Sequence, residues 1–444
     1  MRYLSAALVL VSGCVLAQSP EPQKITFQDA MERARRYSGQ IQSAALAARL
    51  AREDKVQAKA AQLPTLNALN QFIYTEGNGT PSGVFVANDG VHVYNEQALV
   101  HQELFSVFRR AEVRRAKAAE AVAAAKRDVA MRGLQATVAQ NFYAVVTAAR
   151  KVANAQTTLK ESDQVLDITR KQEQGGEAAK ADVIKAQLQQ QQRQRDLSDA
   201  QVTLEKNKVA LAVLIFPDIT RDFAAVDDLD NPPALESFEA FQTKASSGSP
   251  DVVAAQASVM QAKREVDVAR YQFLPSFALD FAYGIDANQF DSRTGYPTQE
   301  SGRSTLPNYL VTGRQNLGYS AQVTLNIPIW NWGATRSKIK QAELRAEQTQ
   351  SDLTLAQKQL KANISSAYLE AQAAHDQIDS LRSSSDLSGE SLRLTLLRYQ
   401  AGEATVLEVV DSQTTLAAAR NAYADGLARY RLAVANIQTL TGQL

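Results

Sequence analysis

The sequence predicts a mainly helical chain that contributes strands to a transmembrane β-barrel, and two observations predict that one helix–strand–strand–helix–helix unit occurs twice. Leu63-Pro64 recurs 211 positions later as Leu274-Pro275. Gly176-Glu177 recurs 226 positions later as Gly402-Glu403, in a short break between two helical stretches. Landmarks that recur in the same order are typical of a tandem repeat. We therefore expect repeat 1 over 18–216, a linker over 217–250 and repeat 2 over 251–444.

The N-terminus has the pattern of a secretory signal peptide, which we expect to span 1–17. Arg2 precedes an apolar stretch that ends in small residues. Two processing sites fit this stretch. Cleavage after Ala17 is the one we favour, whereas a lipobox ending at Cys14 would leave that residue lipidated. Cys14 is the only cysteine of the chain, so no internal disulfide is expected.

Composition argues against a catalytic centre and against a nucleic-acid partner. The 444 residues have a net charge of +1, three histidines and one cysteine. No acid, base and nucleophile occur in a recognisable constellation, and no basic patch is interleaved with aromatic residues. We therefore expect neither an enzyme nor a protein that binds nucleic acid, a metal or a cofactor. No apolar stretch after the signal is long enough for a transmembrane helix.

The helical stretches are too long for an ordinary helical bundle. Helices are predicted over 26–62, 109–172, 178–215, 334–398 and 404–441, with a further helix opening repeat 2. The stretch 109–172 alone would reach roughly 95 Å, which favours a coiled coil or a solenoid element. Residues of 334–398 step by three and four positions in turn, as in a left-handed heptad seam. The step from Leu360 to Ile364 breaks this order and predicts a stutter. The seam is Ile339, Ala342, Ala346, Thr349, Leu353, Ala356 and Leu360, continued by Ile364, Ala367, Ala371, Ala374, Ile378 and Leu381.

Four strands are predicted, at about 64–76, 91–105, 275–287 and 317–328. From Phe277 to Ile285 and from Tyr319 to Ile327, apolar residues alternate with small or polar ones. This alternation is typical of barrel strands with one face toward lipid, and it also fits a soluble β-sandwich. Because a bacterial barrel needs at least about eight strands, four strands in a membrane would require an oligomer.

Proline and glycine mark the expected junctions between helices and strands. Pro64 and Pro275 stand where a helix ends and a strand begins, and Pro328 stands where the last strand gives way to a helix. Proline lacks an amide hydrogen and is tolerated at such element ends. Gly333 follows Pro328 just before the long helix of repeat 2.

Taken together, these motifs resemble those of the TolC family of outer-membrane efflux proteins, over essentially the whole mature chain. The resemblance rests on Ala61-Gln62-Leu63-Pro64, Phe273-Leu274-Pro275, Ile327-Pro328-Ile329-Trp330-Asn331-Trp332-Gly333 and the stretch from Tyr399 to Gly442. It implies a homotrimer in the bacterial outer membrane, with a twelve-stranded barrel (four strands per subunit) in lipid and a helical coiled-coil tunnel in the periplasm. It also implies a periplasmic adaptor, or membrane fusion protein, and an inner-membrane transporter as partners.

By the same resemblance, the turns between the long helices line the periplasmic entrance and meet the adaptor. The adaptor-docking turns are expected at Gly175, Gly176, Glu177, Ala401, Gly402 and Glu403. The entrance gate is expected at Asp182, Lys185, Glu408 and Asp411. Three copies each of Glu408 and Asp411 would form stacked carboxylate rings whose mutual repulsion raises their pKa. Lys185 occupies the position in repeat 1 that Asp411 occupies in repeat 2, and it can pair with Asp411. The alternative for these carboxylates is simple stabilisation of a helix N-terminus.

The functional hypothesis is a passive exit duct of a tripartite efflux pump or a type I secretion system, opened at its periplasmic tip by the adaptor. The sequence contains no G-x-x-x-x-G-K-[ST] motif, so energy would come from a partner. The alternative is a soluble periplasmic coiled-coil scaffold without channel activity. A stand-alone diffusion porin would not explain the two long helical hairpins. The sequence does not indicate which cargo is exported.

Overall fold

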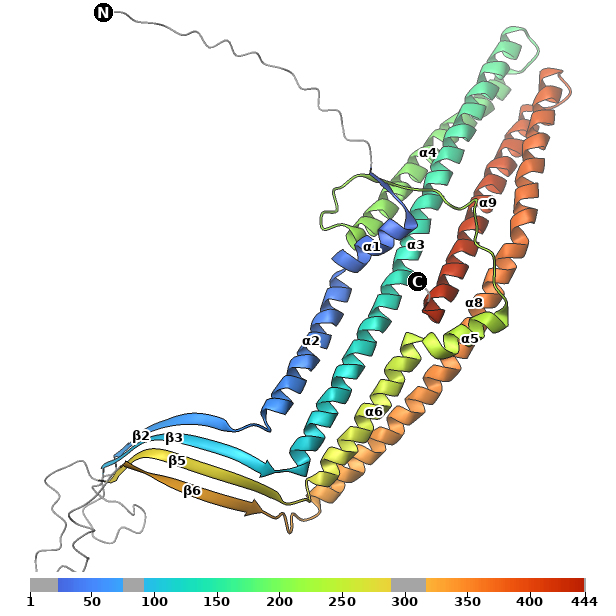
Figure 1. The fold of residues 1–444 in the computed structure, drawn as a ribbon. Helices are drawn as coiled ribbons and strands as arrows, with labels where there is room; N and C mark the ends of the chain where they lie inside the picture. Colours follow the sequence, from blue (N-terminus) through green and yellow to red (C-terminus); the bar gives the residue numbers. More distant parts are fainter. Residues whose placement is uncertain (1–22, 75–91, 289–316, 443–444) are drawn as a thin grey trace, which may run out of the picture.

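A computed structural model describes residues 23–74, 92–288 and 317–442 of the chain. It shows an elongated molecule with a four-stranded sheet at one end and two long helical hairpins at the other (Figure 1). The expected signal peptide and Cys14 lie outside the described residues, as do positions 75, 76 and 91 of the expected strands.

The sheet consists of β2 (Thr65–Tyr74), β3 (His92–Phe105), β5 (Ser276–Asn288) and β6 (Leu317–Asn326). Its order is β2-β3-β5-β6, and every neighbouring pair is antiparallel. Each repeat supplies one hairpin, and the repeats meet where β3 pairs with β5. Among the described residues, β2 and β6 are therefore the two open edges of the sheet.

The register gives the sheet one apolar face and one polar face, as the alternation predicts. Val100 pairs with Phe281 and Tyr283 pairs with Tyr319 on the apolar face. One position along β3, His101 lies on the polar face opposite Asp280, and the His101 Nδ1 and Asp280 Oδ1 atoms are 2.6 Å apart. The large apolar side chains of this sheet are exposed to a great extent in the single chain.

The helix expected over 26–62 is two helices, and the same break occurs again 211 positions later. Helix α1 (Phe27–Tyr37) and helix α2 (Gly39–Ala60) are separated by Ser38, whose backbone is extended. Helix α5 (Phe238–Gly248) and helix α6 (Pro250–Tyr271) are separated in the same way by Ser249. All four boundaries repeat at the spacing of 211 found in the sequence. The segment 217–250, expected to be a linker, thus contains α5, the counterpart of α1.

The four long helices form two hairpins. Helix α3 (Val107–Gln174) turns into α4 (Lys180–Ile215), and α8 (Ala334–Gln400) turns into α9 (Val406–Thr441). Their ends differ from the expected ones by two residues at most. No helix in the described ranges has a stretch that is both long and apolar enough to cross a membrane.

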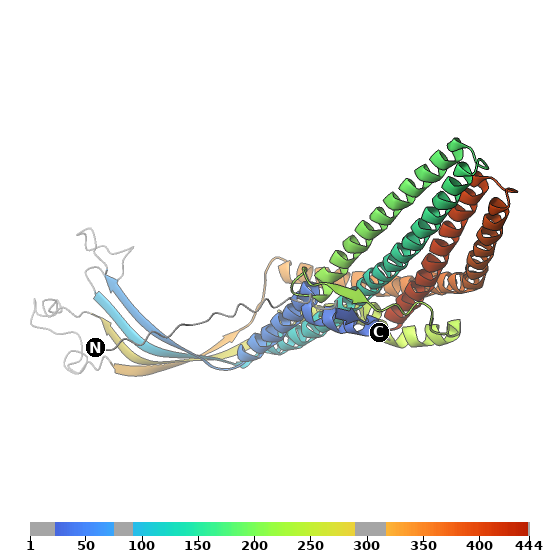
Figure 2. The same cartoon turned by 90° about the horizontal axis from the view of Figure 1, so that it is seen from above.

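The heptad seam of α8 faces neighbouring helices along its whole length, since every seam residue is buried or half-buried. Before the stutter, Ala342 packs against Val266 of α6. After it, Ala371 packs against Ala433 and Ile437 of α9. Helix α8 therefore changes partner at the stutter, where α5 also packs. Figure 2 shows that the hairpin ends of α3, α4, α8 and α9 are tilted relative to α2.

The segment between the repeats is held against the middle of the molecule. Strand β1 (Gln23–Ile25) pairs in parallel with β4 (Phe223–Ala225), next to the largest apolar core. Arg150 of α3 forms ion pairs with Asp227 at 2.5 Å and with Asp230 at 2.6 Å. Burial and the neighbouring carboxylate of Asp228 raise the pKa of Tyr143 to about 12. The strand pairing and the ion pairs therefore hold this segment as a fixed band across the helices.

Candidate functional site at the hairpin tips

The two hairpin tips have the same backbone, 226 positions apart. The Glu177 amide donates to the Gln172 carbonyl at 2.8 Å, and the Glu403 amide donates to the Arg398 carbonyl at 2.8 Å. This pattern ends a helix with one residue in the left-handed region. Gly176 has φ +80° and Gly402 has φ +75°. Because a Cβ would meet nothing within 4 Å at either position, backbone conformation rather than space requires glycine there.

The first turn after the tip differs between the repeats. In α9, the Thr405 amide donates to Glu408 Oε1 at 3.1 Å, and the Glu408 amide donates back to Thr405 Oγ1 at 3.3 Å. This is a capping box, which satisfies two free amides of a helix N-terminus. In α4, the cap position is Ala179, whose side chain makes no such bond. Only repeat 2 therefore has a side-chain cap at the tip.

The four expected gate residues are not brought together within one chain. Lys185 Nζ lies 3.5 Å from Asp182 Oδ1 on the same helix, and no ion pair joins it to Asp411 in the part that the structure describes. Glu408 Oε2 accepts from Arg398 Nη1 at 3.4 Å. The bonds from Thr405, followed by the charge of Arg398, lower the pKa of Glu408. Within one chain these donors set the direction, whereas carboxylates of neighbouring copies in a ring would act in the opposite direction.

A buried contact joins the two hairpins just above the tip. Thr169 Oγ1 of α3 and the Tyr399 hydroxyl of α8 are 2.8 Å apart, and Gln172 Nε2 donates to the Tyr399 carbonyl at 3.1 Å. Burial raises the pKa of Tyr399. Val165 and Val409 belong to the apolar cluster around this contact. Tyr399 opens the stretch on which the family resemblance rests, but its contact with Thr169 was not predicted, and its equivalent in repeat 1 is Glu173.

The tips enclose a groove of about 550 Å³. Of the expected gate residues, Asp182 and Lys185 line it, whereas Glu408 and Asp411 do not. Of the expected docking residues, Glu177, Ala401 and Gly402 line it. The full lining is Gln172, Glu177, Ala178, Ala179, Asp182, Lys185, Tyr399, Gln400, Ala401, Gly402, Ala404, Thr405, Val406 and Leu407. The groove therefore presents both turns, and a mixture of charges, on one surface.

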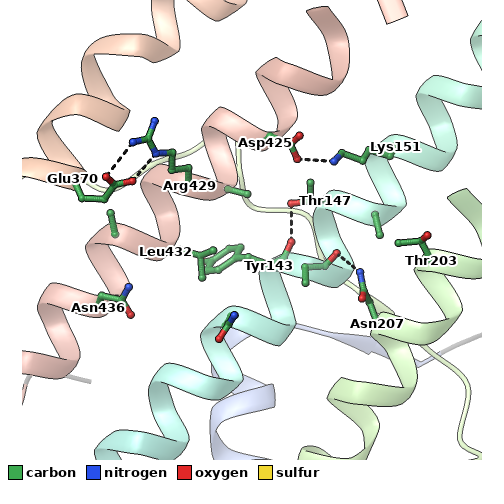
Figure 3. A pocket seen from close by; sticks show the side chains of 15 residues that line it. Tyr143, Thr147, Lys151, Thr203, Asn207, Glu370, Asp425, Arg429, Leu432 and Asn436 are labelled. Carbon is green, nitrogen blue, oxygen red and sulfur yellow. Dashed lines mark hydrogen bonds and ion pairs between the residues drawn. The ribbon is translucent and has the colours of Figure 1, made fainter. Parts of the chain in front are cut away.

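Further from the tip, polar pairs continue the contact between the hairpins. Arg420 of α9 forms an ion pair with Glu161 of α3 at 3.1 Å, and both side chains are mostly buried. Lys151 pairs with Asp425 at 2.8 Å beside a second cavity, of about 560 Å³ (Figure 3). Such pairs depend on relative helix position, so sliding of one hairpin along the other would break them.

The residues expected at the junctions lie at element ends. Pro64 lies between α2 and β2, Pro275 lies between α6 and β5, and Pro328 lies two residues after β6. Gly333 has φ +84° and is the N-cap residue of α8. The sheet and the hairpins are therefore separated by short junctions, with the tips at the far end of the molecule.

Comparison with known proteins assigns this arrangement to a family. A family model described as outer membrane efflux protein matches residues 30–215 and 243–443. The chain belongs to the outer membrane efflux protein family. The resemblance noted in the sequence is thus confirmed, and so are the outer-membrane location and the mainly helical, TolC-like fold with barrel strands.

Members of the outer membrane efflux protein family from several bacteria are similar to the chain. The outer membrane protein TolC of Vibrio cholerae is 22% identical over 448 residues, which cover 100% of this chain and 94% of that protein. The pyoverdine export outer membrane protein OpmQ of Pseudomonas putida is 26% identical over 318 residues, covering 65% of this chain and 60% of OpmQ.

Solved structures of such channels have the same fold. The Campylobacter jejuni CmeC outer membrane channel matches 94% of this chain and 85% of its own, with a TM-score of 0.78 and 15% identity. The open state of the Neisseria gonorrhoeae MtrE outer membrane channel matches 94% of this chain and 88% of its own, with a TM-score of 0.74 and 21% identity.

Proposed function

We propose that three copies of the chain form a closed outer-membrane channel that acts as the passive exit duct of a tripartite efflux pump or a type I secretion system. The observation that carries this proposal is the sheet. Its four strands have open edges at β2 and β6 and an exposed apolar face. In lipid, unpaired strand edges are very costly, and closure into a barrel removes them. Edge-to-edge joining of three copies would give twelve strands.

The hairpin tips are the proposed gate of this duct. The contact between Thr169 and Tyr399 and the ion pair between Arg420 and Glu161 hold the hairpins of one chain together. Asp182, Lys185, Glu408 and Asp411 would recur three times around the entrance. An iris-like movement of the inner helix pairs would separate these groups and widen the entrance.

The groove between the tip turns is the proposed docking place of the periplasmic adaptor. It is lined by both turns and lies at the end of the molecule opposite the sheet. A partner that binds both turns can bias the position of one hairpin against the other, because its binding energy differs between the closed and open arrangements. The inner-membrane transporter bound to the adaptor would supply the energy and select the cargo.

Single-channel recording tests the duct and its gate together. Detergent-purified mature protein is reconstituted in a planar bilayer, and wild type is compared with the Glu408→Ala/Asp411→Ala double variant. We expect a small, cation-preferring conductance in the wild type that changes in the variant, because carboxylate rings attract cations. The matched control is Glu347→Ala/Asp352→Ala, which removes two exposed carboxylates from α8 far from the tip.

Two results would contradict the proposal. Equal changes in conductance in both double variants would show that the tip carboxylates do not form the gate. The absence of conductance in every variant, from protein that also stays in solution without detergent, would exclude the duct. The periplasmic scaffold would then be the remaining hypothesis.

A further inference from the structure

Both tryptophans of the chain lie at one place, the junction between β6 and α8. Trp330 is 75% exposed and Trp332 is 90% exposed, and their rings pack edge to face with centroids 5.9 Å apart. Ile329 beside them is 87% exposed. Three large apolar side chains within four residues, almost fully exposed in the single chain, need an apolar or interfacial surrounding. We call residues 329–332 the tryptophan hook.

The backbone of the tryptophan hook is held in place by hydrogen bonds. Trp332 has φ +54° and is the only described residue other than glycine with a positive φ. The Ala334 amide donates to the Asn331 carbonyl at 3.0 Å, and the Asn331 side chain donates to the Thr335 hydroxyl. A bulky residue with positive φ persists only where its surroundings impose it. The hook is therefore a formed structure that holds both rings away from the core.

The tryptophan hook continues the apolar face of the sheet. Val323, Leu325 and Ile327 are exposed on that face of β6 and its extension, and Ile329 follows at the same spacing of two. The face lies against lipid in an outer-membrane protein of this fold. The hook comes directly after it, on the side of the periplasmic helices (Figure 1). Tryptophan is enriched at this depth, where an apolar ring body and a polar N–H are both satisfied.

Positive charge lies directly beyond the hook. Arg336, Lys338 and Lys340 in the first turns of α8 are exposed, and none forms an ion pair with another described residue. A second copy joined through β2 and β6 would bring the end of its α2 beside this surface, and that end carries charges of both signs, Glu53, Asp54, Lys55 and Lys59. The phosphates of anionic lipids are complementary.

We propose that the tryptophan hook and two basic residues of α8, Arg336 and Lys340, form a binding site for anionic phospholipid in the periplasmic leaflet of the outer membrane. Trp330 and Trp332 lie at the boundary between headgroups and acyl chains. Arg336 and Lys340, one turn apart on the same face of α8, bind the headgroup phosphates from the periplasmic side. The site fixes the depth of the barrel and the height of the tunnel. It depends on the outer-membrane location but not on the proposed gate or pump.

Tryptophan fluorescence tests this site directly, because no other tryptophan contributes to the signal. The full mature protein is reconstituted in vesicles of phosphatidylethanolamine and phosphatidylglycerol. One of the two lipids carries bromine, a contact quencher, either near the top or near the end of its acyl chains. We expect stronger quenching by bromine near the top, and stronger quenching when phosphatidylglycerol is the brominated lipid. Trp330→Phe and Trp332→Phe each leave a single reporter, so the depth of each ring is measured.

The charge contribution is tested with Arg336→Gln/Lys340→Gln. This variant is expected to lose the preference for brominated phosphatidylglycerol, by about fivefold for each charge removed, while the quenching depth stays the same. The matched control is Lys358→Gln/Lys361→Gln, at exposed basic positions of α8 far from the junction. An unchanged preference in the double variant would overturn the anionic-lipid site.

Two other outcomes would overturn the lipid assignment altogether. Quenching by acrylamide from water but not by brominated lipid would place the hook in the periplasm. Protection from both quenchers would show that a second copy of the chain covers it. Conductance measured on the same preparation reports separately on the proposed duct, so the two proposals fail independently.

Discussion

Glu408 has two roles on the first turn of α9, because each of its carboxylate oxygens has a different partner. One oxygen caps the helix through Thr405, and the other faces Arg398. These donors lower the pKa of Glu408, so the group stays ionised at neutral pH in the single chain. A ring of three such carboxylates would therefore begin fully charged, and Arg398 would offset part of the repulsion.

Glu408→Gln should make stability less dependent on pH. A carboxyl whose folded pKa lies below its ordinary value of 4.5 stabilises the fold above that value, and this contribution is lost as the pH falls through the folded pKa. We expect the variant to melt below wild type at pH near 7 and the difference to close in acid, below about pH 4. Circular dichroism melts in detergent measure this, with the exposed Glu347→Gln as control. A difference that persists in acid would contradict the role of the ionised group.

At the scale of elements, the tips and the helix breaks repeat more faithfully than the side chains on them. Both tips have the same hydrogen bonds and a glycine with positive φ, although Thr405 in repeat 2 corresponds to Ala179 in repeat 1. A serine separates the two helices of each pair, Ser38 between α1 and α2 and Ser249 between α5 and α6. The backbone of the unit is thus duplicated, while the chemistry at the two tips has diverged.

Gly402→Ala should destabilise the second hairpin by about 1–2 kcal/mol, because an L-residue with a side chain is disfavoured at φ +75°. The control is Gly133→Ala in the interior of α3, where a Cβ meets nothing within 4 Å. Alanine there should stabilise the helix by up to about 1 kcal/mol. Thermal melts of both variants should shift in opposite directions. A shift in the same direction would contradict the conformational role of the tip glycine.

In the molecule as a whole, the repeats are joined at several levels along the long axis. The β3–β5 pairing joins them in the sheet, and Arg420 with Glu161 joins the hairpins. Between these levels, Arg150 holds the connecting segment on α3 through Asp227 and Asp230. Because this band crosses the helices where they change partners, it restricts how far one repeat can move against the other.

Arg150→Ala should release the connecting segment without unfolding the helices. The Arg150 side chain is 19% exposed and binds two carboxylates, so its loss should cost on the order of 1 kcal/mol locally. Limited proteolysis should then cleave within 218–236 about fivefold faster, since cleavage follows local opening. Arg195→Ala is the control, because Arg195 bonds only within its own helix, to Gln192. Equal cleavage rates in both variants would show that the ion pairs do not hold the segment.

The sequence by itself determined the repeat, the type of each main element and the two faces of the sheet. These features follow from periods of two and of three to four residues, which act along the local chain. The seam of α8 and its stutter at Leu360 were predictable for the same reason. Local signals were weaker: a single serine marks the backbone break at Ser38, and the 11-residue helix α5 inside the expected linker has only a short apolar stripe, Phe238, Phe241 and Ala245.

Only the tertiary structure decided which polar groups meet. Thr169 and Tyr399 are 230 positions apart in the chain, and no local pattern links them. Lys185 pairs with Asp182 rather than with Asp411, and Glu408 turns to Thr405 and Arg398. The exposure of Trp332 likewise follows from its neighbours in space. Contacts of this kind depend on atoms coming within about 3 Å, and that distance is set by how the helices pack rather than by the order of residues.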